Sequence, residues 1–276
     1  MSLNSVNTNV GAQIALQNLN RTNSDLAATQ SRISTGLKVA SAKDDGAAFA
    51  IAQSQRSTVS SLDAVKDSLS RGSSVVDVSL SAGSAVSDAL TQLKEKALAA
   101  SDTSLDTTSR SALKNDFESI RDQITKTLSN ATFNGINLVD GTNASIAALA
   151  NADGSSTLTV AGQDLSLGGA IVSLATDASF SSATSAANLL TTLDDSISNV
   201  SAALAKLGTS SKALENHASF VGKLQDSITA GIGNLVDADL AKESAKLQAL
   251  QTKQQLGVQA LSIANQSTSS VLSLFR

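Results

Sequence analysis

Apolar side chains recur along much of this chain at alternating spacings of three and four residues. The longest stripe of this kind runs from Leu190 to Leu235, and a second runs from Leu62 to Ala100. This spacing lines apolar residues along one side of an α-helix, and its persistence over several heptads is typical of a coiled coil. The pattern therefore predicts two long helices that pack against each other.

A third, shorter stripe predicts one more helix in the same bundle. It consists of Leu113, Phe117, Ile120, Ile124 and Leu128. In the second stripe, Gly72, Ser79 and Gly83 stand at positions that an apolar side chain would otherwise fill, and residues this small allow close helix approach. We expect long helices over about 45–100, 109–129 and 188–235 that share one seam.

Both ends of the chain carry separate amphipathic stripes. The long central stripe loses its phase near Asp239, and a new register begins at Leu240. The C-terminal stripe contains Leu240, Leu247, Leu250, Leu261, Val271, Leu274 and Phe275, and the N-terminal stripe contains Val10, Ile14, Leu19, Leu26, Ile33 and Leu37. Two such segments have little apolar surface for a stable isolated hairpin, so we expect them to order against other copies of the chain.

The segment 131–185 differs in composition from the rest of the chain and predicts a small insert. It is rich in Gly, Ser, Thr, Asn and Ala, and residues 157–160 alternate Thr-Leu-Thr-Val before Gly162. The alternation suggests a short β-hairpin whose second strand would be Leu165, Ser166 and Leu167. The predicted division is 1–40 for the N-terminal helix, 41–235 for a central rod with this insert, and 236–276 for the C-terminal helix.

Composition narrows the possible functions. The chain of 276 residues has no Cys, Pro, Trp or Tyr, so disulfides, thiolate metal sites and proline kinks are excluded. Its 20 basic and 24 acidic residues include no basic block that could neutralise a phosphate backbone, which argues against nucleic acid. No apolar run is long enough for membrane insertion, and residues 1–25 lack the apolar core of a cleaved signal peptide.

The residues that could carry chemistry do not form a recognisable site. The sole histidine, His217, has neither a Cys nor a second His with which to bind a metal. The adjacent carboxylates of Asp44 and Asp45, and of Asp194 and Asp195, would point about 100° apart on a helix, so a solvated face or helix start explains them better. We therefore expect no enzyme activity, no catalytic residues, no cofactor and no metal.

Three segments resemble one known family. Residues 32–52 read RISTGLKVASAKDDGAAFAIA, and this stretch looks like the N-terminal signature of bacterial flagellins. Residues 236–276, which end in LSLFR, resemble the flagellin C-terminus, and FNGINLVDG at 133–141 resembles the segment after the third rod helix of that family. The chain is identified as a member of the flagellin family on these residues.

The resemblance implies a mainly α fold: an elongated antiparallel coiled-coil bundle with a small β-hairpin insert, whose terminal helices form an inner coiled-coil tube in a filament. The function implied is a self-assembling subunit of the flagellar filament, exported by a type III route. Implied partners are further copies of the chain, filament cap and hook-filament junction proteins, and an export chaperone. The chaperone would bind the stripe formed by Leu247, Leu250, Leu261 and Val271.

Two other interpretations stay open from the residues alone. A hook-filament junction protein shares similar terminal helices but does not propagate a filament. A coiled-coil adaptor that binds partners without polymerising would also satisfy the stripes, and only the terminal motifs argue against it.

Overall fold

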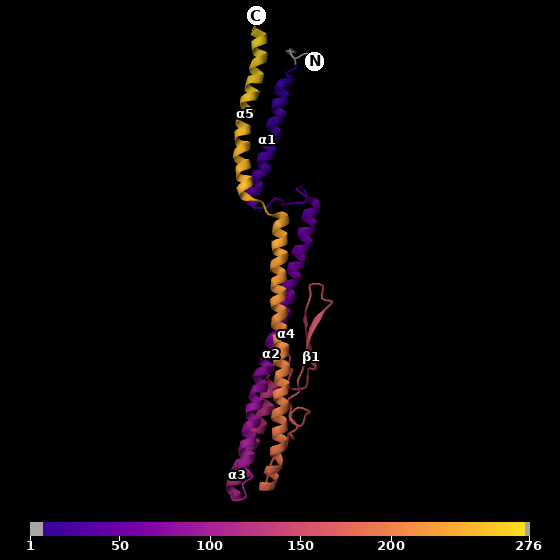
Figure 1. Cartoon of the computed structure of the whole chain (residues 1–276), viewed down its shortest axis with the longest axis vertical. Coiled ribbons are helices and arrows are strands. Elements are labelled where there is room, and N and C mark those ends of the chain that lie inside the picture. Colours follow the sequence, from indigo (N-terminus) through magenta and orange to yellow (C-terminus); the bar gives the residue numbers. More distant parts are fainter. Residues whose placement is uncertain (1–7, 274–276) are drawn as a thin grey trace. The chain divides into compact units, whose positions relative to one another are not determined.

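The computed structural model describes the backbone of residues 8–273 and the side chains up to residue 266. This part of the chain contains five helices and a two-stranded sheet. Figure 1 shows the course of the chain through these elements. It divides into two compact units. The terminal unit consists of the residues up to Ser57 and from Ser227 onward, and the central unit is Thr58–Asp226. Two long helices, α2 (Gly46–Ala100) and α4 (Ala183–Val236), contribute to both units.

In the central unit, α2 and α4 pack antiparallel through the two predicted stripes. The side-chain amide of Gln225, late in α4, donates to the backbone oxygen of Val59, early in α2. At the other end of the unit, Lys94 forms an ion pair with Asp194. The core between the helices comprises Leu62, Val65, Leu69, Val76, Val86, Leu90, Leu93, Leu193, Val200, Leu207, Leu214 and Val221. The prediction of two long helices with a shared seam is confirmed.

Small residues set how closely these helices approach. A Cβ atom added to Gly83 would lie 2.5 Å from the Leu204 Cδ2 atom and 3.3 Å from the Leu165 Cδ1 atom. Ser79 is buried, and its hydroxyl donates to the backbone oxygen of Val75 at 2.7 Å. Close packing against a larger side chain at Gly83 would require the neighbours to shift, which is why these seam positions hold small residues.

The third helix, α3 (Thr107–Asn130), begins where the Asp106 side chain accepts a hydrogen bond from the backbone N–H of Ser109. Its buried side chains are Phe117, Ile124 and Leu128, three members of the predicted stripe. The Phe117 ring meets the Phe180 ring edge-on, with centroids 5.3 Å apart. This aromatic contact holds the segment before α4 against α3.

The hairpin forms, but one of its two strands differs from the prediction. β2 (Thr157–Ala161) matches the alternating segment, yet it pairs antiparallel with β1 (Ser145–Leu149), upstream of it. The predicted partner around Leu165 and Leu167 was wrong, because both leucines are buried in the core of the central unit. The Gly162 N–H donates to the Ala144 oxygen at 2.8 Å, which closes the ladder on the upstream side.

Candidate subunit interface

The terminal unit is built on an antiparallel pair of helices, α1 (Val10–Thr35) and α5 (Leu240–Ser273). Their opposite ends are joined by hydrogen bonds. The Asn9 side-chain amide donates to the Ala264 oxygen at 2.8 Å, and the Arg32 guanidinium lies 3.4 Å from the Glu243 carboxylate. In Figure 1 the two helices run side by side.

The side chains between these helices follow heptad spacing. The least exposed positions, here called the terminal seam, are Ala12, Ala15, Leu19, Thr22, Leu26, Thr29 and Ile33 on α1, and Glu243, Leu247, Leu250, Gln254, Gly257, Leu261 and Ala264 on α5. A Cβ atom on Gly257 would lie 3.2 Å from the Leu19 Cδ1 atom, so the helices are close at this level. The spacing is that of an antiparallel coiled coil.

This seam is only partly shielded from solvent within one chain. Among its described positions only Thr29 and Leu250 are buried. The Thr29 hydroxyl and one carboxylate oxygen of Glu243 are buried without a hydrogen-bond partner among the described residues. An unsatisfied buried polar group costs about 1–3 kcal/mol. Most apolar side chains of the seam therefore stay partly exposed and the seam carries a polar penalty, so the terminal pair is less well buried than the core of the central unit.

Polar turns organise the segment between α1 and α2. The Asp44 carboxylate accepts from the backbone N–H groups of Ala40 and Ser41 and from the Ser41 hydroxyl. The backbone N–H of Ser41 is the main reason that the pKa of Asp44 lies below its ordinary value. Asp45 accepts from the backbone N–H groups of Ala47 and Ala48. These two carboxylates therefore shape a turn and begin a helix, rather than acting as an acid-base pair.

The breaks after α1 and α4 are tied together by backbone hydrogen bonds. Lys38 N–H donates to the Val236 oxygen at 2.6 Å, and Ala238 N–H donates to the Gly36 oxygen at 2.8 Å. The Asp239 carboxylate then accepts from two N–H groups at the start of α5. The chain thus breaks at the point where the sequence stripe loses its phase, between Val236 and Leu240.

Several large apolar side chains of the terminal unit point away from the seam into solvent. These outward apolar residues are Val10, Ile14 and Leu16 on α1, and Leu240, Leu256, Val258 and Ile263 on α5. Leu256 and Ile263 are seven residues apart and lie on one side of α5, whereas Val258 lies on another. Apolar residues therefore flank the seam on more than one side.

The predicted interface residues fall into three groups. Leu19, Leu26, Ile33, Leu247, Leu250 and Leu261 lie in the terminal seam, while Leu37 lies in the backbone junction. Val10, Ile14 and Leu240 are exposed. The Val271 side chain and residues Leu274 and Phe275 lie outside the described residues. The role of all these residues in contacts between subunits, or with a chaperone, stays a prediction.

Sequence reasoning missed four of the outward residues: Leu16, Leu256, Val258 and Ile263. A heptad stripe selects one line of apolar residues, and these four lie off that line. The sequence nevertheless carried a signal of these residues. Four large apolar residues fall within eight positions, and they cannot all lie on one face of a helix: Leu256, Val258, Leu261 and Ile263. The local density of apolar residues, rather than their period, identifies a helix whose apolar residues extend beyond one seam.

The described residues hold no cluster of three or more His, Asp and Glu side chains placed to bind a metal. His217 has a structural contact, since its Nε2 atom lies 2.7 Å from the Ala150 oxygen on the hairpin. No described helix combines the length and apolarity needed to cross a membrane.

Comparison with known proteins agrees with this geometry. Residues 6–144 match the family model for the bacterial flagellin N-terminal helical region, and residues 190–275 match the C-terminal helical region. Flagellin FljM of Caulobacter vibrioides is 60% identical over the full length of both chains. A flagellin of Brucella melitensis is 38% identical and covers 99% of each chain.

A solved structure shares the fold at low identity. A putative flagellar hook-associated protein from Vibrio parahaemolyticus superposes with a TM-score of 0.58 at 16% identity, and the match covers 70% of this chain and 100% of that one. This likeness concerns the fold alone. The full-length identity with FljM is what separates a filament protein from the hook-filament junction alternative.

Proposed function

This chain belongs to the bacterial flagellin family, and we propose that its outward apolar residues join neighbouring subunits in the flagellar filament. Members of this family are structural subunits of that extracellular filament and not enzymes. Flagellins polymerise with copies of themselves, so a surface on this chain must be complementary to another surface on it. The terminal unit offers the largest group of exposed apolar side chains described.

Large apolar side chains are exposed on both flanks of the α5 seam, and this observation carries the proposal. One partner helix, α1, covers only the line of Leu247, Leu250 and Leu261. Ile263, on one flank, has 67% of its surface exposed, and Val258, on the other, has 54%. Neighbours that bury both flanks would have to lie on two sides of α5, which favours an extended lattice of helices over a closed dimer.

Assembly then proceeds by coupled folding and binding. The terminal seam is weak in a single chain, so α1 and α5 gain most of their stability when copies bury the outward residues. Because stability that depends on binding rises with concentration, the terminal helices should order as polymer forms. The terminal helices would line the inside of the filament, as the predicted inner coiled coil requires.

An export chaperone would have to compete with α1 for the same residues. The proposed chaperone-binding stripe includes Leu247, Leu250 and Leu261, which face α1 within the chain. A chaperone groove that binds this stripe must therefore bind α5 only after α5 has separated from α1. The weak seam supports such a separation. A chaperone-bound chain would be held monomeric until it leaves the cell by the type III route. Outside the cell, filament cap and hook-filament junction proteins would contact the assembled filament.

Polymerisation of the purified chain tests the proposal directly. Monomer is seeded or treated with a precipitant and imaged by negative-stain electron microscopy, beside a chain that lacks residues 240–276. Long uniform filaments from the full chain alone would support assembly through α5. Filaments from the shortened chain would contradict it, because that chain lacks four of the outward residues.

A further inference from the structure

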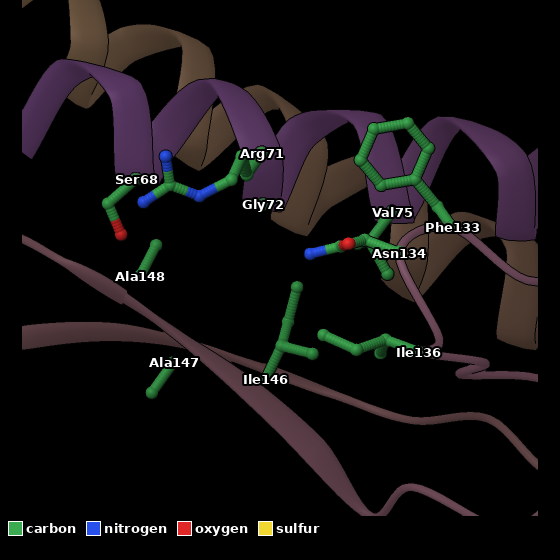
Figure 2. A pocket seen from close by; sticks show the side chains of 10 residues that line it. All are labelled: Ser68, Arg71, Gly72, Val75, Phe133, Asn134, Ile136, Ile146, Ala147 and Ala148. Atoms are coloured by element: carbon green, nitrogen blue, oxygen red, sulfur yellow. The ribbon is translucent and has the colours of Figure 1, made fainter.

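The central unit also has a cavity and an exposed aromatic ring that are not accounted for by its own fold. The cavity lies between α2, the 133–136 turn and β1, and it has a volume of about 130 Å³. Figure 2 shows the Arg71 guanidinium at one side of it, with the Phe133 ring and the Asn134 amide at the other. Val75 and Ile146 contribute apolar walls.

The cavity has the size and chemistry of an aromatic-ring site. An apolar protein cavity of about 150 Å³ holds a benzene molecule. Arg71 has no ion-pair partner among the described residues, so its guanidinium is available to lie over a ring face. The Phe133 ring can meet a second ring edge-on. An acidic side chain would pair with the Arg71 guanidinium but would make no favourable contact with the apolar walls of the cavity.

Phe220 supplies a ring of this kind on the same unit. It is 57% exposed, while Phe117 and Phe180 are buried and Phe49 and Phe133 are half-buried. A single exposed apolar side chain is ordinary on a protein surface, but this one is held in place. Its ring lies against the His217 ring at a centroid distance of 5.8 Å, and His217 is anchored on the Ala150 oxygen. A ring fixed before binding loses little conformational entropy when it binds.

The ring and the cavity are displaced from each other along the bundle. The cavity floor includes Gly72, whose added Cβ atom would lie 3.7 Å from the Leu214 side chain. Phe220 lies six residues beyond Leu214 on α4, or about 9 Å along the helix axis. Two complementary features at different places on one surface produce a head-to-tail contact, which can repeat without closing.

We propose that Phe220 of one copy inserts into the Arg71 cavity of a neighbouring copy, so that the central units are linked head to tail. This inference rests on the polymerisation proposed above but uses a different surface, since neither feature belongs to the terminal unit. It accounts for the position of His217, which orients the ring that the neighbour receives.

Cross-linking in assembled polymer tests the contact, because the chain has no cysteine of its own. Chains carrying Phe220→Cys and chains carrying Ile136→Cys, at the cavity edge, are mixed, polymerised and treated with a short bismaleimide. The control replaces Phe220→Cys with Leu98→Cys, an apolar position on α2 that is also 57% exposed. We expect a covalent dimer from the first mixture in polymer, none from unpolymerised chains, and none from the control.

A chain carrying both Phe220→Cys and Ile136→Cys should give a ladder of covalent oligomers, because a head-to-tail contact repeats. Dimers alone would overturn the head-to-tail arrangement. Polymer that sediments normally but yields no cross-link in the first mixture would overturn this inference and leave the outward residues of the terminal unit as the interface. Failure of the unsubstituted chain to polymerise would overturn both this inference and the proposed function.

A double-mutant cycle provides an independent readout. Phe220→Ala should raise the critical concentration for polymerisation by roughly tenfold, because apolar burial is lost. Arg71→Ala should raise it by roughly 2- to 30-fold, because a cation–π contact is lost. If the two residues meet, the double substitution raises it by less than the product of the single effects. A multiplicative result would show that they act at separate places. The melting temperature of the unpolymerised chain should stay the same in all three variants.

Discussion

Replacing Ile263 with aspartate tests whether the outward apolar residues join subunits. The side chain is 67% exposed within one chain, so about two-thirds of its surface remains to be buried by a neighbour. Full burial of an isoleucine contributes about 1.5–3 kcal/mol, which leaves about 1–2 kcal/mol for the contact between subunits. An aspartate at the same place must also lose hydration of its charge, at a further cost of several kcal/mol. A total above about 3 kcal/mol raises the critical concentration at least about 100-fold.

The assay is sedimentation of seeded polymer over a range of concentrations, with circular dichroism of the unpolymerised chain. Ile263→Asp should leave the monomer spectrum unchanged, whereas Leu261→Asp, in the terminal seam, should reduce its helix content as well as block polymerisation. Both variants should leave the central unit folded. Ile263→Asn separates loss of apolar surface from the added charge, and its effect should be intermediate. Polymerisation of Ile263→Asp at the parent's critical concentration would refute the proposed interface.

Three further predictions concern stability. Gly83→Val should lower the melting temperature, because its side chain would displace Leu204 at a cost of about 1–3 kcal/mol; an unchanged thermal unfolding curve would contradict the close packing. Thr29→Val should protect the amides of α1 from hydrogen exchange, since it removes a buried hydroxyl that has no partner among the described residues, at a gain of about 1 kcal/mol. Asp106→Ala should loosen the first turn of α3 at neutral pH. The pKa of Asp106 is held below its ordinary value of 3.8 chiefly by the backbone N–H of Ser109, so the stabilisation is present above that value and is lost as pH falls through the folded-state pKa. The difference between Asp106→Ala and its parent, followed by circular dichroism, should therefore disappear in strong acid.

The helices of the central unit were predictable because their signal is local. A heptad stripe identifies a helix and its buried side from residues within a few turns, and the small residues at Gly72, Ser79 and Gly83 already indicated close packing. The capping carboxylates Asp106 and Asp239 likewise act on backbone groups two or three residues away. The flagellin family was also recognisable from motifs at the two ends of the chain.

The strand partner of β2 and the exposure of the outward apolar residues depended on tertiary structure. Leu165 and Leu167 carry a strand-like alternation, but burying them in the central core stabilises the chain more than pairing them beside Gly162 would. In the terminal unit, periodicity identified the line of Leu247, Leu250 and Leu261 but could not say that α1 of the same chain would cover it. Ile263 and Val258 were left outside that line. The sequence by itself determined where helices form and which residues are apolar, because these depend on nearby positions. Only the tertiary structure decided which apolar residues one chain can bury and which it leaves exposed, because burial depends on segments that are far apart in the sequence.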